Sequence, residues 1–96
     1  MDNLELWQKK ADILKALAHP SRLFVVDRLR EAACSVGELA AEVGCDISTM
    51  SRHLSVLQNQ SIVFSKKIGT TVNYHLNIPC VLNFFYCIDE VIDSGG

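Results

Sequence analysis

The feature that most constrains this chain is a close series of helix start and stop signals near its middle. Ser35 and Glu38 have the spacing of a capping box, in which the two side chains satisfy the first backbone N–H groups of a helix. Gly44 is a typical residue for ending that helix, and Asp46 is a favourable N-cap for the next one. A short helix, a glycine-containing turn and a second helix are therefore predicted over residues 36–58, which is the layout of a helix-turn-helix.

Helical periodicity dominates the rest of the chain, with one interruption. A first helix is predicted over residues 4–17, a second from Pro20, and a last one over about 79–92. Residues 62–67 and 70–76 instead alternate like the two strands of a hairpin, joined by Ile68-Gly69. The residues expected to face inward are Leu4, Trp7, Ala11 and Leu14; Leu23, Val26, Leu29 and Ala33; Val36, Leu39, Ala40 and Val43; and Ile47, Met50, Leu54 and Leu57. The prediction is a mainly α chain with a small β-hairpin, in the winged helix-turn-helix order ααααββα.

Composition bounds the remaining possibilities. Ninety-six residues make one domain, residues 1–96, whose tail at 94–96 is expected to fray. A hydrophobic fraction of 49% excludes general disorder, and a net charge of -2 excludes a polycation that coats nucleic acid. No apolar run reaches the ~18 residues of a membrane span. The start of the chain lacks the pattern of a secretory signal, so we expect a cytoplasmic protein with reduced thiols.

The outer face of the fourth predicted helix has a composition suited to nucleic acid. At ~100° per residue, Arg52 points away from the buried side, with small hydroxyl side chains around it and His53 on the flank. Arginine can form paired hydrogen bonds with guanine or phosphate, and short hydroxyl side chains allow close approach. The alternative is a merely polar helix face. The DNA contacts predicted on this helix are Ser48, Thr49, Ser51, Arg52, His53 and Ser55.

Other basic residues are divided between the wing and the second helix. Lys66 and Lys67 end the first strand and are predicted to contact phosphates, with a solvated strand end as the alternative. Arg22, Arg28 and Arg30 are expected to be surface charges or structural ion pairs. No nucleophile–base pair or metal triad is evident, so we do not expect an enzyme.

Three stretches make the chain resemble the arsenic-repressor (ArsR/SmtB) family of bacterial winged-helix repressors. They are LKALAHPSRL at 14–23, SVGELA at 35–40 continued by STMSRHLSVL at 48–57, and the hairpin end VNYHL at 72–76. The resemblance implies a homodimer built from the first and last helices. It also implies binding to an imperfect palindrome in double-stranded DNA, with release when an inducer binds.

The resemblance also assigns roles to individual residues. By position in the motif, Ser48, Thr49, Ser51 and Arg52 are the family's base and phosphate contacts. The second strand begins with Thr70-Thr71, where the family often has Arg or Lys, and this departure weakens the predicted wing contact.

The inducer site must be argued from the residues present. The CxC-type arsenite motif of the founding members is absent at the third helix, and residues 78–93 contain no histidine for a zinc or nickel site. Cys80 and Cys87 remain, on nearly the same helix face but ~10 Å apart along the axis. They could meet if the helix start is irregular, or across the axis of an antiparallel dimer.

Paired thiolates select soft acceptors such as As(III) or Sb(III). The predicted inducer is therefore arsenite, antimonite or another thiophilic metal ion bound by Cys80 and Cys87, with no resident cofactor. One alternative is a thiol-redox or persulfide sensor, in which the same pair forms a disulfide or polysulfide. The other is that both cysteines are core residues, as is expected of Cys34 and Cys45.

Overall fold

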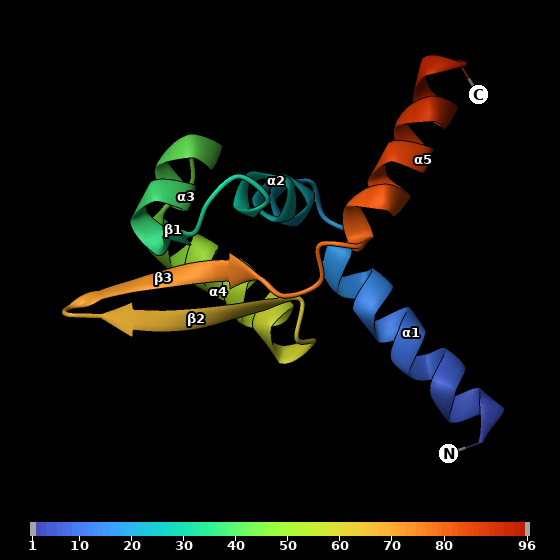
Figure 1. The fold of residues 1–96 in the computed structure, drawn as a ribbon, viewed down its shortest axis with the longest axis horizontal. Helices are drawn as coiled ribbons and strands as arrows, with labels where there is room; N and C mark the ends of the chain where they lie inside the picture. Colours follow the sequence, from blue (N-terminus) through green and yellow to red (C-terminus); the bar gives the residue numbers. More distant parts are fainter. Residues whose placement is uncertain (1, 96) are drawn as a thin grey trace.

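The computed structural model describes residues 2–95 and has the predicted winged helix-turn-helix architecture (Figure 1). The helices are α1 (Asn3–Leu17), α2 (Pro20–Leu29), α3 (Val36–Val43), α4 (Ile47–Asn59) and α5 (Val81–Asp93). The strands are β1 (Cys34–Ser35), β2 (Val63–Ile68) and β3 (Thr71–Leu76). The hairpin of β2 and β3 extends away from the helices as the wing.

The predicted helix signals are confirmed at atomic detail. The hydroxyl of Ser35 accepts the backbone N–H of Glu38 at 3.2 Å, and the Glu38 carboxylate accepts that of Ser35 at 3.0 Å. Gly44 ends α3 at φ 84°, a left-handed conformation that suits glycine. The Asp46 carboxylate caps α4 by accepting the N–H of Thr49 at 2.7 Å. These signals fix the angle at which α4 follows α3.

The sheet has one strand more than the sequence indicated. β3 pairs antiparallel with β2 on one edge and with the two-residue β1 on the other. The strand β1 is too short to show an alternating pattern, so periodicity could not predict it. The hairpin turn also differs from the prediction, because Ile68 pairs with Thr71 and the turn is Gly69-Thr70.

The core is built mainly from α2, α3, α4 and the base of the sheet. Val25, Leu39, Met50, Leu54 and Leu57 are completely buried. The prediction for α2 was partly wrong. Leu23 is 39% exposed and Ala33 lies beyond the helix end, whereas Val25, which was not predicted, is in the core.

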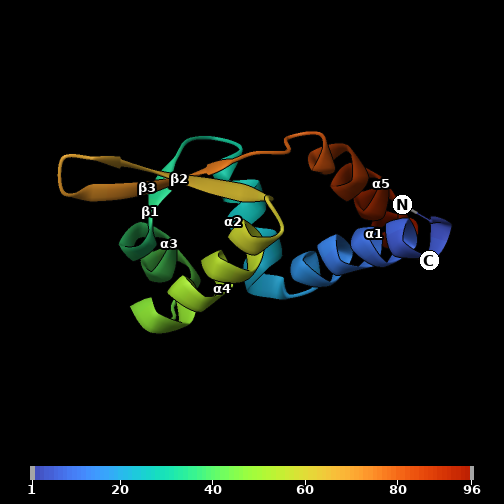
Figure 2. The same ribbon diagram turned by 90° about the horizontal axis from the view of Figure 1, so that it is seen from below.

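The helices α1 and α5 extend from this core on the side opposite the wing (Figures 1 and 2). The Cα radius of gyration is 14.5 Å, larger than the roughly 12–13 Å expected of a compact domain of this length. The apolar seam predicted on α1 is not covered, since Leu4 is 78% and Trp7 63% exposed. On α5, Phe84 and Ile92 are exposed as well.

Ser94 and Gly95 follow α5 in a turn that is hydrogen-bonded to the last residues of the helix. Ser94 caps α5, its hydroxyl donates to the carbonyl of Val91, and the N–H of Gly95 donates to the carbonyl of Ile92. Gly96, the last residue of the tail predicted to fray, lies outside the described residues. Within residues 2–95, none of the helices combines the length and the apolar character needed to span a bilayer.

Candidate nucleic-acid interface

The helix α4 presents a hydroxyl-rich outer face with one cation. Ser51, Arg52 and Ser55 are exposed, and Thr49 is half-buried. Among the described residues no ion pair includes Arg52, so its guanidinium is available to a ligand. The helix has no Asp or Glu between Ile47 and Asn59. A carboxylate lies only at its N-cap, where Asp46 accepts bonds from Ser48 and Thr49.

The first turn of α4 is already organised by its cap. Asp46 accepts the hydroxyl of Ser48 at 2.9 Å as well as the N–H of Thr49. The bond from the Thr49 backbone, followed by that from Ser48, holds the pKa of Asp46 below its usual value. The Ser48 side chain is exposed, and its hydroxyl proton is donated to Asp46. The lone pairs of the Ser48 oxygen therefore remain available to a ligand.

Ile47 corrects the predicted inward face of α4. It is 57% exposed, whereas Met50, Leu54 and Leu57 are fully buried as predicted. As the first residue of the helix, Ile47 precedes the turn that packs on the core. An exposed isoleucine beside the hydroxyl residues can contact a thymine methyl group. Sequence reasoning missed this residue because periodicity alone assigned it to the core.

His53 also differs from its predicted place on the flank. The side chain is 9% exposed, and its Nδ1 accepts the Nε–H of Arg22 at 3.1 Å. This imidazole faces α2, so we do not include it in the DNA surface. The signal that could have placed it is its spacing of three residues from Met50, which is buried on the same side.

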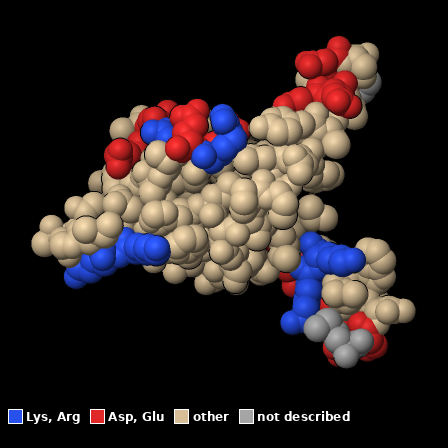
Figure 3. Space-filling view, viewed as in Figure 1, with Lys and Arg blue, Asp and Glu red and all other residues tan. Residues whose placement is uncertain are grey.

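The wing carries both predicted lysines at exposed positions. Lys66 pairs with Asn73 and Lys67 with Val72, so the two neighbouring side chains point to opposite faces of the ribbon. The Nζ of Lys66 lies 5.7 Å from the centre of the Phe64 ring. In Figure 3 basic atoms gather along the β2 edge of the wing, with no acidic atoms beside them.

Arg28 in α2 and Arg30 at its end form ion pairs within the protein, as predicted, whereas Arg22 bonds His53 and the carbonyl of Ala16 instead. Both carboxylate oxygens of Glu42 accept the Nε–H of Arg28 at 3.1 Å, which joins α2 to α3. The bond to Glu42 is the main cause of the raised pKa of Arg28. Arg30 forms a pair with Asp27 at 3.4 Å. These pairs form a mixed acidic and basic area over α2 and α3, separate from the basic wing (Figure 3).

The cysteines fall into two groups. Cys34 is fully buried and its thiol donates to the carbonyl of Ala32 at 3.5 Å; burial raises its pKa. Cys45 is half-buried against the core. Cys80 and Cys87 are exposed free thiols at the start and middle of α5.

The start of α5 bears on one of the two routes by which Cys80 and Cys87 could meet. Cys80 has right-handed helical dihedral angles, φ −61° and ψ −20°, and its carbonyl accepts the N–H of Asn83. The helix start is therefore not irregular in the way that would fold Cys80 back toward Cys87. No group of three or more His, Cys, Asp or Glu side chains within residues 2–95 forms a metal cluster. This geometry favours a thiol site shared between two chains.

A recognition helix held on a three-helix core, beside a wing with exposed lysines, defines a winged helix-turn-helix regulator that binds DNA. Comparisons with known proteins support this class. The family model described as "Helix-turn-helix domain" matches residues 17–63. The uncharacterized HTH-type transcriptional regulator Rv0081 of Mycobacterium tuberculosis is 35% identical over 93 residues, which cover 96% of this chain and 82% of that protein.

Solved structures agree with the sequence comparison. The homodimeric winged helix-turn-helix DNA-binding domain of Mb0332 from Mycobacterium bovis, a possible ArsR-family regulator, has a TM-score of 0.83 at 26% identity, covering 99% of this chain and 90% of that one. The transcriptional repressor BigR from Xylella fastidiosa has a TM-score of 0.73 at 33% identity, covering 88% and 86%. The chain belongs to the ArsR/SmtB family of transcriptional regulators.

Proposed function

We propose that this chain is a homodimeric repressor that binds an imperfect palindrome in double-stranded DNA through α4 and the wing. The observation that carries the proposal is the outer face of α4, where exposed Arg52 stands among hydroxyl side chains with no carboxylate on the helix. Ser48, Thr49, Ser51, Arg52 and Ser55 would approach base edges and phosphates, and Lys66 and Lys67 would approach the adjacent backbone. Such a repressor acts at chromosomal DNA in the cytoplasm.

The uncovered helices support the dimer. α1 and α5 both present large apolar side chains that the rest of the chain leaves exposed, including Trp7, Leu14, Phe84 and Ile92. Several large apolar side chains exposed together on neighbouring helices are typical of a protein interface. The M. bovis structural relative is a homodimer. A two-fold dimer presents two recognition helices related by symmetry, which favours a palindromic site.

The experiment is to select duplexes from a random-sequence pool with the purified protein and to measure affinity for the selected duplex over a range of salt. We expect a symmetric consensus and an affinity that falls steeply as salt rises, because each neutralised phosphate releases counterions. A protein that enriches no sequence, or whose affinity does not change with salt, would refute the proposal.

The inducer proposed for this repressor is arsenite, antimonite or another thiophilic ion, bound by Cys80 and Cys87. Both thiols are exposed, Cys80 at the N-cap and Cys87 in the middle of α5, a helix that also has exposed apolar side chains. If the α5 helices of two protomers cross antiparallel near Asn83 and Phe84, Cys80 of each protomer lies near the partner's Cys87. The dimer would then hold two equivalent dithiol sites that suit a soft acceptor.

A mixed dimer tests this arrangement. One protomer carries Cys80→Ser and the other Cys87→Ser, each with a different affinity tag for purification of the heterodimer. Sites between chains leave one intact Cys80–Cys87 pair, whereas sites within chains leave none. We expect arsenite to release DNA from the heterodimer and not from either homodimeric variant. Loss of the response in the heterodimer would exclude the shared site.

The competing proposal is that Cys80 and Cys87 sense reactive sulfur or oxidants. Their exposure favours this chemistry equally. Titration of the parent with tetrasulfide beside arsenite separates the two, since a redox sensor forms a dithiothreitol-reversible disulfide or polysulfide. If neither reagent releases DNA, both cysteines are structural.

A further inference from the structure

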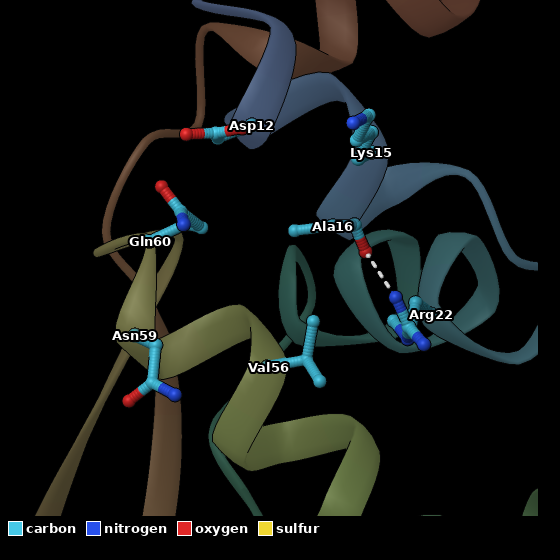
Figure 4. Close-up of a pocket in the computed structure, with 7 residues that line it drawn as sticks. All are labelled: Asp12, Lys15, Ala16, Arg22, Val56, Asn59 and Gln60. Atoms are coloured by element: carbon cyan, nitrogen blue, oxygen red, sulfur yellow. Dashed lines mark hydrogen bonds between the residues drawn. The ribbon is translucent and has the colours of Figure 1, made fainter. Parts of the chain in front are cut away.

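One arginine joins three helices next to the proposed DNA surface. The Nε–H of Arg22 donates to Nδ1 of His53 at 3.1 Å, and its Nη1 donates to the carbonyl of Ala16 at 3.2 Å. Ala16 is in the last turn of α1, Arg22 in the first turn of α2, and His53 in α4. Figure 4 shows the bond from Arg22 to Ala16 at the edge of a surface depression between these helices. A single guanidinium therefore ties the recognition helix to a helix that we assign to the dimer interface.

The bond to His53 requires a neutral imidazole. An Nδ1 that accepts a hydrogen bond carries no proton, so the proton of the ring is on Nε2. The side chain is 9% exposed, and the ring of His19 lies 4.5 Å away between centroids. Burial, followed by the charges of His19, Arg22 and Arg52, lowers the pKa of His53 below its ordinary value.

The groups around this contact are mainly cationic. α2 contributes Arg22 and α4 contributes Arg52, whereas Nδ1 of His19, before α2, accepts the backbone N–H of Ser21 at 3.1 Å. On the side of α1, Lys15 and Asp12 line the depression beyond the guanidinium (Figure 4). No carboxylate is among the charges that shift the pKa of His53, so a protonated imidazole there would lack a stabilising partner.

We infer that Arg22 is a positioning residue for DNA recognition, which fixes the rotation of α4 by holding His53 against α1 and α2. The inference rests on the proposed DNA-binding role of α4. Arg52 directly precedes His53 in that helix, so the anchored side chain sets the direction in which the exposed guanidinium points. Neither Arg22 nor His53 needs to touch DNA.

The contact also predicts a direction of pH dependence. The neutral imidazole is dominant above the ordinary histidine pKa of 6.5, and the bond is lost as the pH falls through the lowered pKa of His53. Specific DNA affinity should then weaken in acid. A histidine that contacts phosphate directly would act in the opposite sense, because its protonation adds a cation to the interface.

The test compares the affinity for the duplex that the parent selects with the affinity for an unrelated duplex. Arg22→Met removes the bonds to His53 and Ala16 and should lower the specific-to-nonspecific ratio at least about tenfold, the effect of losing one hydrogen bond to a charged group, without changing the salt dependence. Arg30→Met is the matched control, because Arg30 is an exposed arginine on the same segment whose partners are Asp27 and Glu31, and it should leave the ratio unchanged. His53→Asn keeps an acceptor near the Nδ1 position and cannot titrate.

The pH profile supplies the second measurement. As the pH is lowered below 6.5, the ratio should fall for the parent and stay level for His53→Asn. Equal profiles for these two proteins, or an unchanged ratio for folded Arg22→Met, would overturn the inference while leaving DNA binding intact. If thermal melting shows that Arg22→Met does not fold, the comparison of the two pH profiles decides. A parent that selects no sequence would overturn the proposed function itself.

Discussion

Removal of Trp7 should weaken the proposed dimer without unfolding the chain. Trp7 is 63% exposed on α1 and outside the core, and the Nζ of Lys10 lies over its ring, 4.4 Å from the ring centre. An aromatic side chain buries about 150–250 Å², so the exposed part corresponds to roughly 95–160 Å² and to about 2–4 kcal/mol if a partner covers it completely.

The expected change in affinity follows from symmetry. A two-fold dimer contains two copies of Trp7, and if the partner covers half of the exposed area, Trp7→Ala costs about 2–4 kcal/mol for the pair. The dimer dissociation constant should therefore rise roughly 30- to 1000-fold, since about 1.4 kcal/mol corresponds to a factor of ten.

Sedimentation velocity over a dilution series measures this constant directly. The matched control is Ile68→Ala, because Ile68 is 69% exposed at the tip of the wing, far from the helices assigned to the interface (Figure 1). The control should dimerise like the parent. If Trp7→Ala does so too, α1 is not part of the dimer interface and the reasoning is refuted.

Three further changes test the local arguments. Ser35→Ala should lower the free energy of unfolding by about 1 kcal/mol through loss of the capping box. Hydrogen bonds from the backbone and side chain of Ser35 lower the pKa of Glu38, so the stability of the parent should fall as the pH drops below 4.5. Urea titrations should show a weaker acid dependence in the variant, which lacks the side-chain bond. Gly44→Ala should lower the free energy of unfolding by about 1–2 kcal/mol. Backbone strain at φ 84° is the whole cause, because no described atom lies within 4 Å of the added methyl group. An unchanged melting temperature would contradict this. Lys66→Gln with Lys67→Gln should reduce the slope of log affinity against log salt by about 2 if both lysines contact phosphate, and an unchanged slope would exclude the wing from the interface.

The architecture could be predicted because its signals are local. The capping box at Ser35, the left-handed Gly44 and the N-cap Asp46 each depend on residues within one turn, so the helix boundaries followed from the sequence. The strand β1 could not be predicted, because two residues carry no alternation and Cys34 pairs with Tyr74, which is distant in the sequence.

The exposure of a candidate site residue could be predicted from the sequence where the helical period alone decides which way its side chain points. Arg52 is exposed because the opposite side of α4 is apolar. Ile47 and His53 were placed wrongly because their surroundings come from other elements. Ile47 begins α4 before the helix reaches the core, and His53 is drawn inward by Arg22 from α2. The proposed meeting of Cys80 and Cys87 would involve a second chain, which no pattern within one chain can specify.

Arg52→Ala is the most direct test of the DNA-binding account. Anisotropy titrations with the selected duplex should show a loss of about 1–3 kcal/mol in specific affinity, roughly 5- to 150-fold, if the guanidinium pairs with a base. The thermal stability should not change, because Arg52 is exposed and makes no ion pair with the other described residues. A folded Arg52→Ala dimer that binds the selected duplex as tightly as the parent would contradict the assignment of α4 as the recognition helix.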